Sequence, residues 1–223
     1  QACDELARMT TGAAIATPAQ PDRLPAGDAP PERWQRAARH AIELAEDKLW
    51  TAVGARARTW LHRRGLDEAT LRYWRIGFNP AARRIDGLFA PRGIVIPCIE
   101  RGQVWSLKLR RASGVPKYVH VAGSRPALFG AHTLARIRAA VICEGEFDAM
   151  LLHRYAGDLA GVVTLGSASG RLPETWLSDL LPVAQILVAY DADTAGARGA
   201  EAWQALSARV RRAALPTELH AKD

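Results

Sequence analysis

The sequence has few cysteines, and they form no pattern that binds metal or builds a disulfide framework. Cys3, Cys98 and Cys143 lie far apart and no C-x-x-C pair occurs, which argues against a zinc ribbon. The six histidines show neither an H-x-E nor an H-E-x-x-H pattern, so a zinc enzyme is disfavoured. No run of 18 apolar residues and no signal peptide is recognisable, so we expect a cytoplasmic protein with no membrane partner.

Acidic residues are scarce in the middle of the chain. Residues 56–125 contain 15 Lys or Arg and 4 Asp or Glu, whereas residues 139–223 contain 7 and 11. With a net charge of +7 and a pI of about 9.8, the composition favours a polyanionic partner such as nucleic acid. The alternative is that the arginines are only solvated. A hydrophobic content of 48% over 223 residues suits one or two folded domains.

Two acidic motifs follow apolar stretches of strand type. The first is A-V-I-C-E-G-E-F-D at 140–148, and the second is I-L-V-A-Y-D-A-D-T-A-G at 186–196. Glu144 ends the first stretch, and Asp191 and Asp193 end the second. Side chains at the carboxyl ends of neighbouring parallel strands meet in one crevice. Because carboxylates there repel one another, and because Mg²⁺ prefers oxygen ligands, these residues indicate metal-dependent phosphoryl transfer.

Strand and helix patterns alternate around these motifs. From residue 139 onward we predict strands at 139–143, 161–165, 185–190 and 217–220, and helices at 147–155, 173–181 and 194–211. Continuous apolar strands separated by helices indicate a parallel sheet covered on both faces. Upstream we predict helices at 31–50, 56–64 and 66–74, and strands of a mixed sheet at 93–98, 104–110 and 118–121. The predicted fold class is therefore α/β, with a basic, partly helical α+β part before the parallel sheet.

The acidic motifs resemble the Toprim signature of primases, topoisomerases and some nucleases, which has a Glu after one strand and D-x-D after a later one. The segments E-G-E-F-D-A-M and Y-D-A-D-T-A-G-A-R-G-A are similar to those of bacterial and phage primases. Further segments follow the order of the primase catalytic core: R-G-I-V-I-P-C, W-S-L-K-L-R, V-P-K-Y-V, A-L-F-G and T-L-G-S-A-S. The resemblance covers residues 55–223.

This resemblance implies a Toprim fold and the synthesis of RNA primers on single-stranded DNA, with NTPs as substrates, an RNA–DNA duplex as product and Mg²⁺ or Mn²⁺ as cofactor. The acids that match the family's catalytic and metal-binding positions are Glu144, Asp191, Asp193 and Asp148, with Asp223 as a last metal ligand. The residues that match its nucleotide- and template-binding cations are Lys108, Arg110, Lys117 and Arg92. Phage-type members also carry an acid where Glu146 stands.

Each of these residues also has a purely structural interpretation. The acids are placed where they can cap helices, and the cations can be ordinary charges that keep a strand edge from aggregating. Two other functions also remain open. One is a Toprim nuclease in which the same acids activate water, and the other is a non-catalytic nucleic-acid-binding module of a phage or mobile-element protein. A topoisomerase is disfavoured, because neither a nucleophilic tyrosine nor a gate domain is evident.

We expect three segments along the chain. Residues 1–31 are the end of a preceding module plus an Ala- and Pro-rich linker, 32–138 a basic N-terminal subdomain, and 139–223 a C-terminally truncated Toprim subdomain. The final A-K-D resembles the start of the K-D-x-N segment of phage primase-helicases, so we expect a piece of a longer protein. The resemblance adds a zinc-binding module and a helicase as partners, in cis or in trans.

Overall fold

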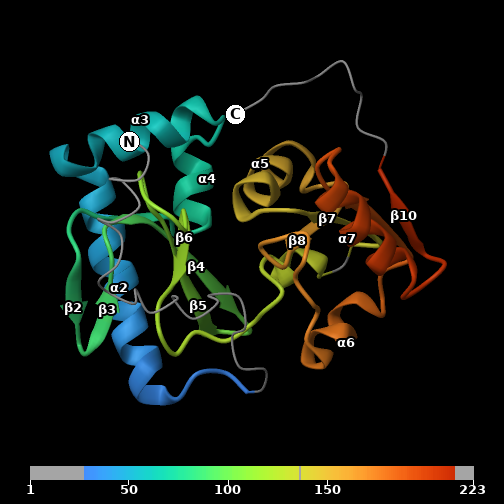
Figure 1. The fold of residues 1–223 in the computed structure, drawn as a ribbon, viewed down its shortest axis with the longest axis horizontal. Coiled ribbons are helices and arrows are strands. Elements are labelled where there is room, and N and C mark those ends of the chain that lie inside the picture. The colour runs from blue at the N-terminus through green and yellow to red at the C-terminus, as the bar shows by residue number, and fades with distance from the viewer. Residues whose placement is uncertain (1–27, 136, 214–223) are drawn as a thin grey trace, which may run out of the picture.

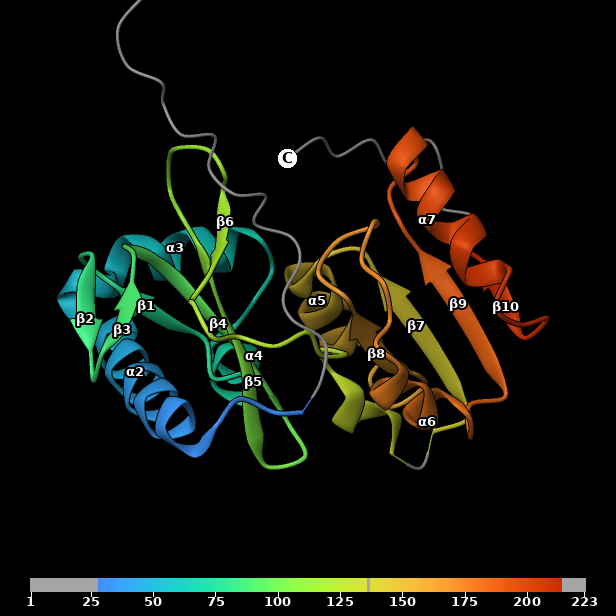
Figure 2. The same cartoon turned by 60° about the horizontal axis from the view of Figure 1, so that its bottom comes forward.

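The computed structural model describes residues 28–135 and 137–213. Most of the expected linker, the strand expected at 217–220 and Asp223 lie outside the described residues. The described chain forms two four-stranded sheets, each with its own helices, which lie next to each other (Figures 1 and 2). Among these residues, none of the helices combines the length and the apolar character that a membrane span requires.

The first sheet is antiparallel, with the strand order β1-β4-β5-β6. Its strands are β1 (Gly77–Asn79), β4 (Gly93–Glu100), β5 (Gln103–Arg110) and β6 (Tyr118–His120), and helix α2 (Glu32–Trp50) covers one face. Trp34 and Ile42 of α2 share a buried cluster with Leu107 of β5. Because side chains alternate along a strand, Lys108 and Arg110 of β5 point to the opposite face.

Shorter elements complete this subdomain. They are a 3₁₀ turn (Ala52–Gly54), α3 (Ala55–Arg63), α4 (Glu68–Tyr73) and the hairpin strands β2 (Arg83–Ile85) and β3 (Leu88–Ala90). Asp67 caps α4, since its Oδ1 accepts a hydrogen bond from Thr70 N at 2.9 Å. The three predicted helices and the three predicted strands are confirmed with shifts of a few residues at their ends. The three-residue strands β1, β2 and β3 were not predicted, because alternation over three positions is too short to recognise.

The second sheet is parallel, with the strand order β10-β9-β7-β8. Its elements in chain order are β7 (Ala139–Cys143), α5 (Glu146–Ala156), β8 (Gly161–Thr164), α6 (Leu177–Leu180), β9 (Gln185–Ala189), α7 (Thr194–Gln204) and β10 (Val210–Arg212). Val162, Val163 and Val188 are completely buried, as expected for strands with helices on both faces. The predicted α/β class with a parallel sheet is confirmed.

Two predicted helices were wrong in extent. The helix predicted at 194–211 ends at Gln204, and Val210–Arg212 forms the parallel strand β10 beside β9. In its last turn the Trp203 indole N–H donates to the Tyr190 hydroxyl at 2.8 Å, and after the helix the chain pairs with the open edge of β9. The helix predicted at 173–181 is a 3₁₀ turn (Glu174–Trp176) followed by the single-turn α6, because Trp176 is anchored in the core against Trp105.

The two sheets share one hydrophobic core. A single buried cluster contains Ile96 and Trp105 of the first sheet together with Ile142 and Trp176 of the second subdomain. The rings of Trp105 and Trp176 meet edge to face with centroids 4.8 Å apart. Burial of this kind, at about 25 cal/mol per Å² of apolar surface, holds the two subdomains in one arrangement.

Candidate active site

Two predicted acids meet at the carboxyl ends of the central strands. Glu144 follows β7 directly and Asp191 comes two residues after β9, and these strands are hydrogen-bonded neighbours in which Cys143 pairs with Ala189. The backbone N–H of Asp191 donates to Glu144 Oε2 at 3.3 Å. The structure therefore brings Glu144 and Asp191 together at one edge of the parallel sheet, where α/β proteins bind their ligands.

The surroundings of Glu144 make its ionised form unfavourable. Burial raises the pKa of the Glu144 carboxyl, and the charges of Asp191, Asp193 and Asp148 raise it further. The hydrogen bond from the Asp191 N–H offsets part of this shift. Three carboxylates thus act electrostatically on Glu144 at this edge.

Asp193 and Asp148 also have capping roles. Asp193 Oδ1 accepts from Gly196 N at 2.8 Å at the start of α7, and Asp148 Oδ2 accepts from Gly145 N at 3.1 Å at the start of α5. Each carboxylate has a second oxygen besides the one that caps, so capping and metal binding are compatible.

The donor set suits a hard divalent cation, although its members are not closely gathered. Across residues 28–135 and 137–213, no three His, Cys, Asp or Glu side chains converge tightly enough to hold a metal ion. Within the same residues, no Lys, Arg or His forms an ion pair with Glu144, Asp191 or Asp193. Carboxylate oxygens are the ligand type that Mg²⁺ and Mn²⁺ prefer, so the chemistry of these residues suits such a cation.

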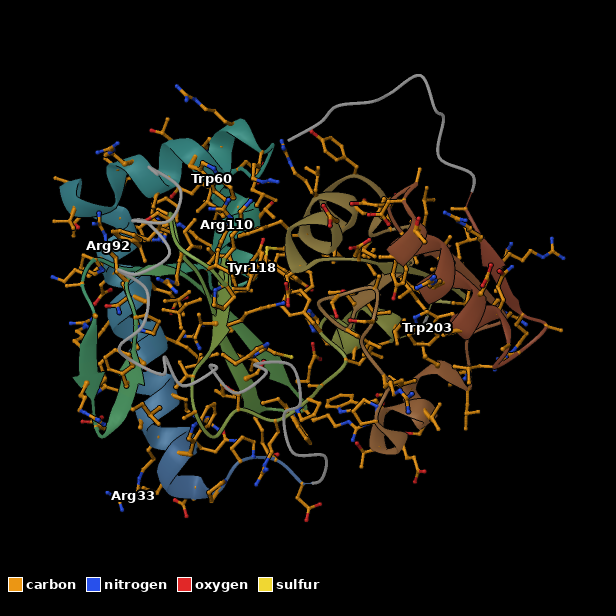
Figure 3. All side chains as sticks on the ribbon, viewed as in Figure 1. Arg33, Trp60, Arg92, Arg110, Tyr118 and Trp203 are labelled. Carbon is orange, nitrogen blue, oxygen red and sulfur yellow. The ribbon has the colours of Figure 1, made fainter. Side chains whose placement is uncertain are left out.

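The predicted cations occupy different environments. Lys108 is buried, and its ammonium contacts Glu146 Oε1 at 2.8 Å and Oε2 at 3.0 Å. The guanidinium of Arg110 lies 3.9 Å from the ring centroid of Trp60. Lys117 and Arg92 are exposed. In Figure 3, Arg110 lies near Trp60 and Tyr118, between the bulk of the first subdomain and the second, whereas Arg92 lies farther out.

Two residues of this region were missed as functional candidates by sequence reasoning. The sequence shows Glu146 as an acid without an assigned role, and Gly166 only as part of the segment T-L-G-S-A-S. In the structure Gly166 contributes its carbonyl oxygen to Lys108 Nζ at 3.1 Å. Its signal in the sequence was a glycine directly after a predicted strand, where a left-handed backbone is common.

Comparison with known proteins supports the resemblance. Residues 141–223 match the model of a family described as Toprim-like. A curated "DNA primase" of Rickettsia felis is 24% identical over 195 residues, covering 70% of this chain. The chain spans about a third of that relative's length, since 32% of it is covered.

Solved primase structures share the fold. The RNA polymerase domain of Mycobacterium tuberculosis primase DnaG superposes with a TM-score of 0.68 at 20% identity, over 82% of this chain and 75% of that one. The primase fragment of the bacteriophage T7 primase-helicase superposes with a TM-score of 0.55 at 25% identity, over 70% and 63%. These likenesses show that the chain has the fold of the DnaG-type primase RNA polymerase core, and that residues 141–223 are similar to the Toprim-like family.

Proposed function

We propose that the chain is the catalytic core of a primase, which joins NTPs into short RNA primers on a single-stranded DNA template. The observation that carries this proposal is the meeting of Glu144 and Asp191 at the tips of neighbouring parallel strands, beside a basic antiparallel sheet. Acids on one side and cations on the other suit a triphosphate that must be held and cleaved. The relative named DNA primase and the similar primase folds support it.

We propose that Glu144, Asp191 and Asp193 hold Mg²⁺ or Mn²⁺, with Asp148 beside them and Asp223 as a further ligand. When bound, the metal supplies the charge that activates a 3′-hydroxyl and stabilises a leaving pyrophosphate. Asp193 and Asp148 keep the starts of α7 and α5 in place through their capping bonds. This fixes the directions from which their second carboxylate oxygens approach the site.

We propose that Arg110, Lys117 and Arg92 bind the phosphates of the nucleotide and of the template strand. Arg110 is oriented by its stacking on Trp60, and Lys117 follows the exposed turn between β5 and β6. Lys108 lies on the same face of β5 but is already bonded to Glu146. A similar DnaG catalytic domain has been solved bound to single-stranded DNA, which is the template class proposed for this chain. An RNA–DNA hybrid, a zinc-binding module and a helicase are the further partners.

The test is template-dependent RNA synthesis with Mg²⁺ or Mn²⁺ and all four NTPs. Changing Asp191 to Asn should abolish synthesis, because one metal ligand is lost, while circular dichroism stays near that of the parent chain. Cleavage of the template without NTPs would instead support a nuclease. Tight DNA binding with neither synthesis nor metal uptake would support a non-catalytic module. Full activity of Asp191→Asn would contradict the assignment of the site.

A further inference from the structure

A buried ion pair connects the two subdomains next to the candidate active site. Lys108 Nζ on β5 lies 2.8 Å from Glu146 Oε1 and 3.0 Å from Glu146 Oε2, and the two side chains are only 9% and 10% exposed. The pair joins the antiparallel sheet to the first turn of α5. Removing one partner of such a pair leaves an uncompensated buried charge, which is strongly destabilising. The pair therefore holds β5 and the start of α5 in one relative position.

A third element closes around this pair. The carbonyl oxygen of Gly166, in the loop after β8, accepts from Lys108 Nζ at 3.1 Å. Gly166 has φ +78°, and a Cβ there would lie 2.6 Å from both Lys108 Nζ and Glu146 Oε1. The Gly166 N–H donates to Thr164 Oγ1 at 2.8 Å, and this hydroxyl donates to the Glu144 carbonyl at 2.9 Å. The loop therefore connects the ion pair to the residue that carries the catalytic carboxylate.

The ammonium of Lys108 has little capacity left for a substrate. Its three N–H donors have three acceptors within 3.1 Å, two on Glu146 and one on Gly166. Its charge is balanced by the Glu146 carboxylate, and the ring of Tyr118 lies 5.0 Å away. A phosphate would have to displace Glu146, at the cost of leaving that carboxylate buried and unpaired.

The position of the pair explains what it can do instead. Arg110 lies two residues after Lys108 on the same strand face, and Glu144 lies two residues before Glu146. Fixing Lys108 to Glu146 therefore fixes the phosphate-binding cation Arg110 relative to the strand-tip acid Glu144. A misplacement of about 1 Å between such groups can lower the rate of a reaction about 10²-fold.

We propose that Lys108, Glu146 and Gly166 form a positioning junction, which sets the spacing between the basic strand and the acids and does not itself bind the nucleotide. This inference rests on the proposed function and adds Glu146 and Gly166 to the residues that the reaction needs. It also changes the expected role of Lys108 from a phosphate ligand to a positioning residue.

The test compares Glu146→Gln, Lys108→Met and the double variant, which keeps both shapes but removes both charges. Extension of an RNA primer annealed to a DNA template is measured with the full 223-residue chain. Each single variant should lose about 10²-fold in kcat with KM for NTP changed less than about threefold. The double variant should recover most of the turnover and of the urea midpoint, since a neutral pair of similar volume replaces the ion pair. Asp179→Asn, which removes the partner of Arg101 between the same subdomains, is the matched control and should keep parent turnover.

Parent-like turnover of Glu146→Gln would overturn the inference. So would a double variant that remains as slow as Lys108→Met with a raised KM, because Lys108 would then contact the substrate itself. If the parent chain extends no primer, the proposed function fails, and hydrogen exchange decides the inference independently. Glu146→Gln must then speed amide exchange both in β5 and in residues 164–170, and unchanged exchange there would overturn it.

Discussion

Individual carboxylates in this chain combine structural and chemical roles. Asp193 accepts a hydrogen bond from the start of α7, and the same residue adds to the negative field that raises the pKa of Glu144. Glu144 also accepts from the Asp191 backbone. Without a cation, this cluster is electrostatically unfavourable, so single substitutions here should change stability as well as activity.

Changing Glu144 to Gln should raise the urea midpoint in metal-free buffer at neutral pH. Because the folded pKa of Glu144 is raised, the folded chain binds its proton more tightly than the unfolded chain does. Above the ordinary glutamate pKa of 4.5 the unfolded chain loses this proton while the folded chain still keeps it, so the free energy of unfolding falls as the pH rises. The fall is complete once the pH exceeds the raised pKa of the folded chain. The increase in the urea midpoint caused by Glu144→Gln should disappear at a pH below the ordinary glutamate pKa. A gain that is the same at acidic and neutral pH would contradict this origin.

Gly166 should tolerate alanine less well than a matched glycine elsewhere. Gly87 also has a positive φ, +91°, but a methyl group added there would have nothing within 4 Å, whereas at Gly166 the methyl would meet Lys108 and Glu146. The left-handed backbone alone should cost alanine about 1–2 kcal/mol at either site. Urea unfolding should show the larger loss for Gly166→Ala, together with lower turnover. Equal losses would mean that the backbone angle alone requires glycine at 166.

At the scale of elements, α2 is joined to the first sheet by a polar contact as well as by packing. Gln35 Nε2 donates to the Val104 carbonyl at 2.9 Å, and the Val104 N–H donates to Gln35 Oε1 at 2.9 Å. This occurs where the β4–β5 ladder shifts register between Cys98 and Ile99. The amide of Gln35 thus supplies both partners that the backbone of Val104 needs.

Changing Gln35 to Met should lower the free energy of unfolding by about 1–3 kcal/mol, because the buried N–H and C=O of Val104 lose their partners. Urea unfolding measures the change. The control is Arg36→Ala on the exposed side of the same helix, which should change stability by less than about 0.5 kcal/mol. A loss no larger than that of the control would show that water or a neighbour replaces the amide.

At the scale of the whole molecule, charge of opposite sign is divided between the subdomains. The excess of Lys and Arg lies in residues 56–125, and the acids gather in residues 139–223. The shared core and the ion pair between Lys108 of β5 and Glu146 of α5 hold these two regions together. We therefore expect a polyanionic strand to be attracted to the first subdomain and repelled from the second unless a divalent cation is bound there.

Binding of single-stranded DNA should weaken steeply with salt. Each phosphate contact contributes about 0.7 to the slope of log affinity against log salt, so Arg110→Ala with Lys117→Ala should lower the slope by about 1.4. The control is Arg33→Ala, since Arg33 lies at the start of α2, far from Arg110 (Figure 3). Fluorescence anisotropy across a salt series measures the slopes. A slope that the double variant does not change would remove these two cations from the binding surface.

The sequence alone determined three of the four strands of the described parallel sheet, β7, β8 and β9, and the place of the acids that follow two of them. Continuous apolar stretches that end at Glu144 and Asp191 are local patterns, and neighbouring parallel strands bring their carboxyl ends together by geometry. The order of the segments also indicated the Toprim fold.

Tertiary structure alone decided which partners these side chains meet. Lys108 and Glu146 are 38 residues apart, and Gln35 and Val104 are 69 apart, so no local pattern connects them. Strand β10 exists because β9 offers an open edge to a segment whose pattern also suits a helix. Local patterns encode which side of an element is buried, whereas register and packing between distant elements decide which charge faces which. That is why the acids were predictable and the Lys108–Glu146 junction was not.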